Sequence, residues 1–126
     1  MTDRKAQALL DGWQLGNVLA ADCPSRIILN HLTNRWGALV MVALATGPHR
    51  FAALRRKVGG VSERMLSQTL KDLEADGFVL RTAHPVVPPH VDYELTALGR
   101  GAAEHVVALA GDLSVALAAA TGGIGR

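Results

Sequence analysis

The sequence predicts a mainly α-helical protein with a small β-hairpin wing: a winged helix-turn-helix flanked by N- and C-terminal dimerisation helices. Two observations carry this prediction. Between residues 51 and 76, a short helical pattern, a Gly-Gly turn and a second amphipathic helical pattern follow one another, as in a helix-turn-helix. Directly afterwards come two short strand-like segments joined by a proline-rich connection, which indicate a hairpin.

Composition is consistent with one globular domain. The chain has 126 residues, 49% of them hydrophobic and 4% aromatic, so the core must be mainly aliphatic. We expect an N-terminal dimerisation helix in residues 1–22, a winged-helix core in 23–96 and a C-terminal dimerisation helix in 97–120. No apolar run approaches the ~20 residues of a membrane span. The charged beginning does not resemble a signal peptide, so we expect a cytoplasmic protein with no membrane partner.

Charge is distributed unevenly along the chain. The net charge is +2, but from Arg35 to Lys71 seven basic residues face one acid, Glu63. That stretch carries +6, which leaves −4 for the rest. A basic surface on a nearly neutral protein is typical of nucleic-acid binding, and arginines on a solvated face are the alternative.

The first part of the chain predicts two helices before the helix-turn-helix. Asp3–Ala21 has apolar residues that either contact a second subunit or cover the core of their own domain. Pro24–Leu32 follows, with Cys23 as its N-cap, because proline is favoured at the first helical position. Its expected inward side chains are Ile27, Ile28 and Leu32.

The strongest amphipathic pattern is Arg35–Thr46, which ends at Gly47-Pro48. Its apolar residues recur at helical spacing: Trp36, Leu39, Val40, Ala43 and Leu44. Phe51–Val58 is the next expected helix, with Phe51, Leu54 and Val58 facing inward.

The second helix of the helix-turn-helix is expected over Ser62–Asp76. Ser62 is a favourable N-cap and Gly77 a favourable stop. Leu66, Leu70 and Leu73 form one stripe that should face the core. The opposite face carries Arg64, Gln68 and Lys71, with Ser67 at its edge. None of these four side chains is acidic and each can donate a hydrogen bond to a base or a phosphate, although a plain solvated face is the alternative. The residues expected to read base edges are Ser62, Arg64, Ser67, Gln68 and Lys71.

The wing is expected from strands Phe78–Thr82 and Val91–Leu95, with His49-Arg50 as a short bridging strand. Prolines should exclude the connection His84–His90 from the ladder and leave it as an exposed tip. The residues expected to contact phosphates are Arg50, Arg55, Arg56, Lys57, Arg81, His84 and His90.

The long segment Ala97–Ala120, capped by Thr96, has apolar residues around much of its circumference. Such a helix is rarely left in water, so we expect it to pair with Asp3–Ala21 in a dimer. The expected interface residues are Leu9, Leu10, Trp13, Val106, Leu109, Leu113 and Leu117.

Other chemistry is disfavoured. The wing histidines have no carboxylate or cysteine at ligand spacing beside them, so we expect no metal site; His31 is a candidate core or seam residue. Gly99-Arg100-Gly101 lacks the spacing and the strand of a dinucleotide site. No nucleophile-elbow motif surrounds a serine. We therefore expect neither a cofactor nor an enzyme.

Several motifs together resemble the HxlR-type winged-helix transcriptional regulators, whose shape is similar to that of the MarR-type regulators. Together they span roughly residues 23–112, which is most of the chain. The matching stretches are C-P at 23–24, R-W at 35–36, G-P-x-R-F at 47–51, L-R-R at 54–56, S-x-R-M-L-S-Q-x-L-K-x-L-E-x-D-G-F at 62–78 and P-V-V-P-P-H-V-D-Y-E-L-T-x-L-G at 85–99. The resemblance implies a homodimer that binds inverted-repeat operators in double-stranded DNA through Ser62–Asp76 and the wing.

The resemblance also implies a role for Cys23, since many members carry an oxidant- or electrophile-sensing thiol in a C-P context. A helix N-terminus favours a thiolate, and Arg26 adds positive charge, whereas Asp22 opposes it. The alternative is a structural cysteine, with a small molecule as effector. A winged helix used as a protein-interaction module is the other function class. As the chain has one cysteine, an internal disulfide is excluded.

Overall fold

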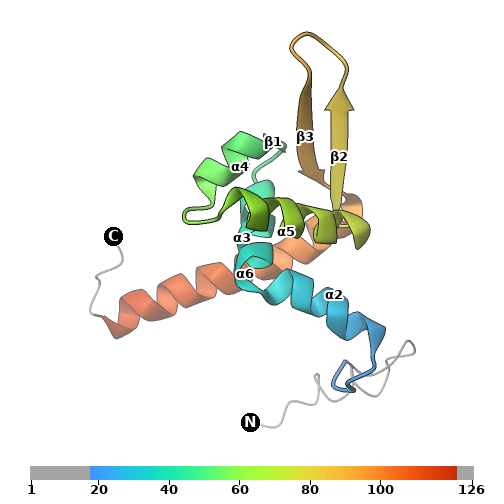
Figure 1. The fold of residues 1–126 in the computed structure, drawn as a ribbon. Coiled ribbons are helices and arrows are strands. Elements are labelled where there is room, and N and C mark those ends of the chain that lie inside the picture. Colours follow the sequence, from blue (N-terminus) through green and yellow to red (C-terminus); the bar gives the residue numbers. More distant parts are fainter. Residues whose placement is uncertain (1–17, 122–126) are drawn as a thin grey trace.

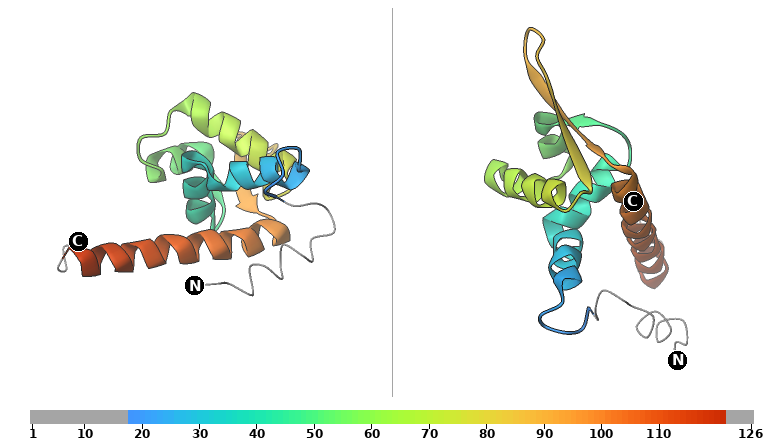
Figure 2. Two further views of the ribbon diagram at one scale, coloured as in Figure 1. Left: turned by 90° about the horizontal axis from the view of Figure 1, so that it is seen from below. Right: turned by 90° about the vertical axis from the view of Figure 1, so that its right-hand side faces the viewer.

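Helix α3, Arg35–Leu44, lies at the centre of the structure, a computed structural model that describes residues 18–121 (Figure 1). Helices α5, Glu63–Ala75, and α6, Ala97–Ala120, lie on opposite sides of α3 (Figure 2). The helix is therefore covered from two directions, which explains its nearly continuous apolar sequence. Its buried residues are Gly37, Val40, Met41, Ala43 and Leu44.

The predicted helix-turn-helix is present. Helix α4, Phe51–Lys57, leads through a turn into α5, and the Ser62 hydroxyl accepts a hydrogen bond from the Met65 amide at 3.0 Å, as expected of an N-cap. The predicted core stripe is confirmed, since Leu66, Leu70 and Leu73 are at most 2% exposed. Gly77 ends the helix region with φ of 87°, a left-handed conformation that glycine adopts without strain.

The three-stranded antiparallel sheet has the order β1-β3-β2. It contains β1 His49–Arg50, β2 Val79–His84 and β3 His90–Leu95, and the β2–β3 hairpin projects from the helices (Figure 1). The prediction that the connection from residue 84 to 90 is excluded from the ladder is wrong at both ends, because His84 pairs with His90. The three prolines lie inside these two residues, so they do not interrupt the last rung.

Two predictions of inward side chains are also wrong. Helix α2, Pro24–Thr33, buries none of its residues, and Ile27 and Ile28 are 63% and 37% exposed. In α3, Leu39 is 44% exposed whereas Met41 is fully buried. The inward face of α3 is rotated toward Met41 because α5 and α6 cover it from two sides. Of the three residues expected to face inward from α2, Leu32 does pack against the core, whereas Ile27 and Ile28 have no such cover from residues 18–121.

Thr96 connects the helix-turn-helix to α6. Its hydroxyl donates to the Gly77 carbonyl at 2.6 Å and accepts from the Gly99 amide at 3.0 Å. Its backbone amide donates to the Phe78 carbonyl at 3.0 Å. These three bonds hold the first turn of α6 against the end of α5 and so fix the direction in which α6 leaves the core.

Helix α6 packs on the core through its first half and projects beyond it in the second half (Figure 2). Its 24 residues, with a mean hydropathy of 1.4 over the most apolar window, are long and apolar enough to cross a membrane. The expectation that no segment approaches this length is therefore wrong. Length and composition alone are weak evidence for a span, and a helix that pairs with another chain passes the same test.

Candidate nucleic-acid interface

The face of α5 opposite its buried stripe presents polar side chains to solvent. Arg64, Gln68 and Lys71 are exposed, Ser67 is half-buried, and Ser62 is exposed at the start of the helix. The Ser62 oxygen already accepts the Met65 amide, so toward a base it retains its hydroxyl proton and one further acceptor site. The structure thus brings the predicted base-reading residues together on one helix.

The availability of these side chains differs. Within residues 18–121, the side chains of Arg64 and Lys71 make no hydrogen bond or ion pair, so both can take an external partner. The Gln68 amide donates to Asp72 Oδ1 at 3.0 Å. Asp72 was not predicted as part of this site, although its i, i+4 spacing from Gln68 is the signal that would have identified it. The hydrogen bond to Asp72 leaves the Gln68 amide oxygen and one amide hydrogen free to contact a base edge.

The basic residues of α4 have different surroundings. Arg55 forms an exposed ion pair with Glu63 at 3.4 Å, a contact of little energetic value in water. Lys57 Nζ donates to the Thr46 hydroxyl at 2.8 Å and lies 3.0 Å from His49 Nε2. Arg56 is exposed. None of these contacts buries a charge, so all three cations remain accessible to phosphates.

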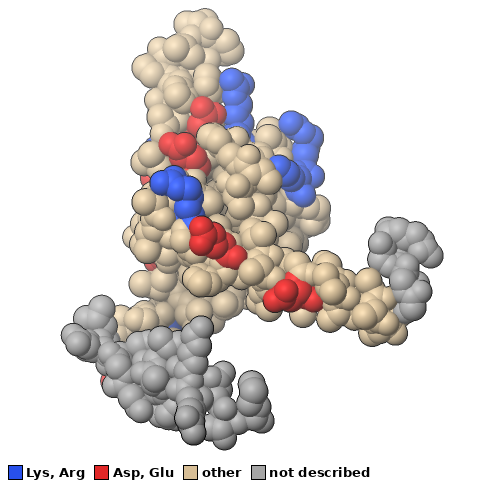
Figure 3. All heavy atoms as spheres, turned by 180° about the vertical axis from the view of Figure 1, so that it is seen from behind, with Lys and Arg blue, Asp and Glu red and all other residues tan. Residues whose placement is uncertain are grey.

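The other predicted phosphate contacts flank α5 and the wing. Arg50 on β1 and Arg81 on β2 are both exposed. Figure 3 shows the face of the molecule that carries α6, opposite α5. Basic and acidic side chains lie close together there, and the projecting end of α6 shows only acidic ones. This mixed charge makes the α6 face poorly suited to binding a polyanion.

The two wing histidines belong to a cluster that the sequence did not predict. His84 Nε2 lies 2.8 Å from Asp92 Oδ2, and His90 Nε2 lies 3.9 Å from the same oxygen. The premise that no carboxylate lies at ligand spacing beside these histidines is therefore wrong. Alternation along His90-Val91-Asp92 would have revealed Asp92, had the strand been extended by one residue.

The predicted dimer residues on α6 form a stripe that continues the buried face of the helix. At 100° per residue, Leu113 and Leu117 lie on the same side as Gly99 and Ala103, which are buried against the core. Val106 is half-buried, whereas Leu109, Leu113 and Leu117 are 59%, 60% and 64% exposed. Leu9, Leu10 and Trp13 lie outside the described residues.

Cys23 occupies the predicted N-cap position of α2, followed by Pro24 at the first helical position. The residue is 5% exposed, and its side chain makes no capping hydrogen bond within the described part of the chain. Further along α2, His31 Nδ1 lies 2.6 Å from Asp76 Oδ2. This pair joins α2 to the end of α5, so His31 links two helices near the surface and is not a core residue.

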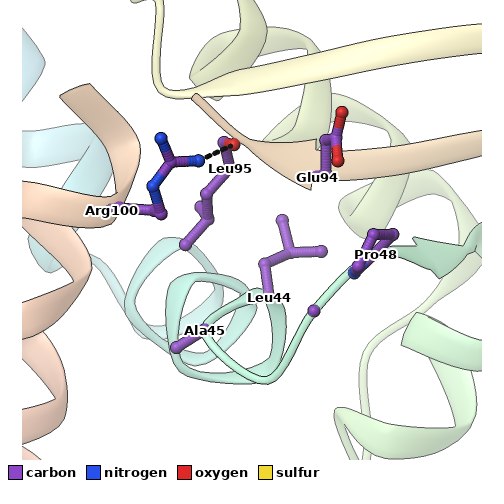
Figure 4. A pocket seen from close by; sticks show the side chains of 7 residues that line it. Leu44, Ala45, Pro48, Glu94, Leu95 and Arg100 are labelled. Carbon is purple, nitrogen blue, oxygen red and sulfur yellow. Dashed lines mark hydrogen bonds between the residues drawn. The ribbon is translucent and has the colours of Figure 1, made fainter. Parts of the chain in front are cut away.

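Figure 4 shows a small hollow between the end of α3 and the start of α6. Its volume is about 130 Å³, below the roughly 300–1,000 Å³ of typical ligand pockets. Inside it, Arg100 donates to the Leu95 carbonyl at 3.3 Å. The lining residues are Leu44, Ala45, Gly47, Pro48, Glu94, Leu95 and Arg100. This hollow is too small for most effector molecules.

Comparisons with known proteins agree with this geometry. A family model described as HxlR-like helix-turn-helix matches residues 31–115. The chain is 61% identical over 95 residues to YtfH of Escherichia coli (strain K12), described as an uncharacterized HTH-type transcriptional regulator, with 75% of each chain covered. It is similar to the structure of the candidate transcriptional regulator ytfH from Salmonella typhimurium, with a TM-score of 0.78, 52% identity, and 88% and 99% of the two chains covered. It is also similar to the redox regulator HypR in its oxidized form, with a TM-score of 0.63, 34% identity, and 69% and 90% covered.

Proposed function

The chain belongs to the HxlR-like helix-turn-helix family of DNA-binding transcriptional regulators, and from this premise we propose that it acts as a cytoplasmic homodimer on an inverted-repeat operator. Helix α5 enters the major groove, and the wing and α4 lie along the phosphate backbone. Regulators of this family act by binding DNA and are not a class of enzymes.

The observation that carries this proposal is the outer face of α5. Its opposite stripe is buried, so the helix is held rigidly, while Arg64 and Lys71 remain without a side-chain partner among residues 18–121. Arginine matches the acceptor pair of guanine, and glutamine matches the edge of adenine. We therefore assign base reading to Arg64 and Gln68. We assign phosphate contacts to the exposed cations of α4 and the wing, which are Arg50, Arg55, Arg56, Lys57 and Arg81.

The proposal of a dimer rests on the second half of α6, whose apolar stripe no other element of residues 18–121 covers. Leu109, Leu113 and Leu117 are more than half exposed, and a stripe of this kind is stabilised by burial against a second copy. We propose that α6 and Asp3–Ala21 form this two-fold seam. Two α5 helices then meet half-sites about 34–36 Å apart, or a multiple of this distance.

DNA binding is tested by gel shift against the region upstream of the protein's own gene, across a salt series. Replacing Arg64 or Gln68 by Ala should cost ~1–3 kcal/mol on the operator and relax preference at particular base pairs. Arg100→Ala, which removes a charge from α6, is the matched control and should bind normally. Equal weakening of α5 variants on operator and unrelated DNA would instead assign them to phosphates. No binding at any salt concentration would favour a protein-interaction module.

We further propose that oxidants or electrophiles regulate binding through Cys23. Cys23 occupies the N-cap position of α2, directly before Pro24, and the similar protein HypR is described as a redox regulator. Because Cys23 is 5% exposed, reaction requires local opening around the start of α2. With no second cysteine, the product is an intersubunit disulfide, a mixed disulfide or an adduct.

The thiol switch is tested by operator binding of the wild type and Cys23→Ser, each before and after diamide or a quinone. We expect the operator affinity of the wild type to change on treatment and that of Cys23→Ser to stay the same. If the wild type binds the operator equally well under every treatment, Cys23 is structural and the effector lies elsewhere.

A further inference from the structure

Three side chains of the kinds that bind transition metals share one face of the wing. In the antiparallel ladder His84 is directly opposite His90, and Asp92 lies two residues further along β3. Alternation along the strands places all three on one face. It is the face turned away from the core, because the alternate residues Tyr93 and Leu95 belong to the core or pack against it.

The three ligand atoms are already close to metal-binding geometry. His84 Nε2 and His90 Nε2 lie 2.8 and 3.9 Å from Asp92 Oδ2, and all three atoms lie within 4.8 Å of one another. The imidazole rings are stacked, with centroids 4.6 Å apart. In a tetrahedral zinc site with bonds of about 2.0–2.1 Å, ligand atoms are separated by about 3.4 Å. Rotation of the imidazole and carboxylate side chains, with the His84–His90 register unchanged, would bring the three ligand atoms to this separation.

We propose that the wing holds one divalent transition-metal ion of the Zn²⁺ class through Nε2 of His84, Nε2 of His90 and a carboxylate oxygen of Asp92. Two imidazoles favour zinc over magnesium or calcium, which prefer oxygen ligands. Three protein ligands leave a fourth position for water or another oxygen ligand. The metal replaces the hydrogen bond between His84 and Asp92, and both rings bind it as neutral imidazoles.

Solvent access and local charge both permit an ion at this place. The side chains of His84, His90 and Asp92 are 38%, 24% and 32% exposed, so an ion can enter without unfolding the wing. Two further charges share this face of the sheet: Arg50, which pairs with Asp92 across β1, and Glu94, two residues along β3. Their opposite signs nearly cancel, so Asp92 remains the charge that attracts the cation.

The site has a mechanical and an electrostatic consequence. His84–His90 is the last rung before the loop Pro85–Pro89, so a bound ion joins the two strands where the hairpin would otherwise fray. With neutral imidazoles, the cluster changes from −1 to +1. A stiffer, more positive wing should bind phosphates more tightly. This consequence rests on the proposed DNA binding, whereas the metal site itself does not.

The site is tested on the full chain after EDTA treatment and removal of the chelator, by titration with Co²⁺ and back-titration with Zn²⁺. We expect the visible absorption of tetrahedral Co²⁺, saturation at one ion per chain and displacement by Zn²⁺. His84→Gln, His90→Gln and Asp92→Asn should each weaken binding at least tenfold. The controls His105→Gln, on the exposed side of α6, and Cys23→Ser should bind as the wild type does.

A second measurement does not depend on the folding of any variant. When Zn²⁺ is added to the wild-type protein, two histidine ring spectra should shift and the other three should not. Absence of Co²⁺ absorption, equal shifts of all five rings, or loss of binding in Cys23→Ser would overturn the site and leave a hydrogen-bonded cluster.

Operator affinity measured with and without Zn²⁺ then separates the metal site itself from its proposed effect on DNA binding. Zn²⁺ should tighten binding by the wild type and not by Asp92→Asn. If the protein still binds Co²⁺ but its operator affinity does not change with Zn²⁺, the proposed link between metal binding and DNA binding is wrong. The metal site and DNA binding themselves would both stand.

Discussion

Replacing Gly99 by Ala tests how α6 is attached to the winged helix. A Cβ at this position would overlap the Phe78 carbonyl oxygen and lie 2.9 Å from its carbonyl carbon. Ordinary carbon contacts are about 3.5–4.0 Å, and both partners are backbone atoms, so no side chain can rotate out of the way. The first turn of α6 must therefore move away from Phe78 by about 1 Å.

The expected magnitude comes from three effects. Overpacking costs about 1–3 kcal/mol, and the movement weakens the two hydrogen bonds that Thr96 makes to Gly77 and Phe78, worth about 1 kcal/mol each. Alanine returns about 1 kcal/mol through its higher helix propensity. We expect Gly99→Ala to lower the free energy of unfolding by about 2–4 kcal/mol.

The matched control is Gly101→Ala, two residues further along α6, where a Cβ meets nothing within 4 Å. It should raise the free energy of unfolding by about 1 kcal/mol. The assay is urea unfolding followed by circular dichroism, with all proteins at one protomer concentration, because the proposed dimer makes stability depend on concentration. A Gly99→Ala protein as stable as the wild type would refute the close approach of α6 to Phe78.

Three further predictions concern helix pairing, assembly and phosphate contact. His31→Ala leaves the Asp76 carboxylate, 11% exposed, without its partner and should lower the free energy of unfolding in urea by about 1–3 kcal/mol. If the effects of His31→Ala and Asp76→Ala on this free energy simply add in the double variant, the two residues are not coupled. Leu113→Glu should make the protein monomeric in light scattering, whereas Val115→Glu, on the opposite side of α6, should leave it dimeric. If both variants remain dimeric, Leu113 does not lie in the proposed seam. Arg56→Ala should reduce the salt slope of operator binding by about one unit without changing sequence preference, and an unchanged slope would remove Arg56 from the phosphate contacts.

The sequence by itself determined the features that depend on neighbours within one or two helical turns. Ser62 and Thr96 cap their helices because a hydroxyl reaches the amide three residues ahead whatever the rest of the chain does. The stripe Leu66, Leu70 and Leu73 was equally predictable, because an amphipathic helix has one apolar side to bury. The outward direction of Arg64 and Gln68 followed from that stripe.

Tertiary structure alone decided the features that depend on partners distant in sequence. Ile27 and Ile28 have the same apolar pattern as buried residues, yet no element of residues 18–121 covers them. The cluster of His84, His90 and Asp92 exists because the register of β2 against β3 places the two histidines opposite each other. Periodicity specifies which side chains share a face, but strand register and helix packing specify what that face meets.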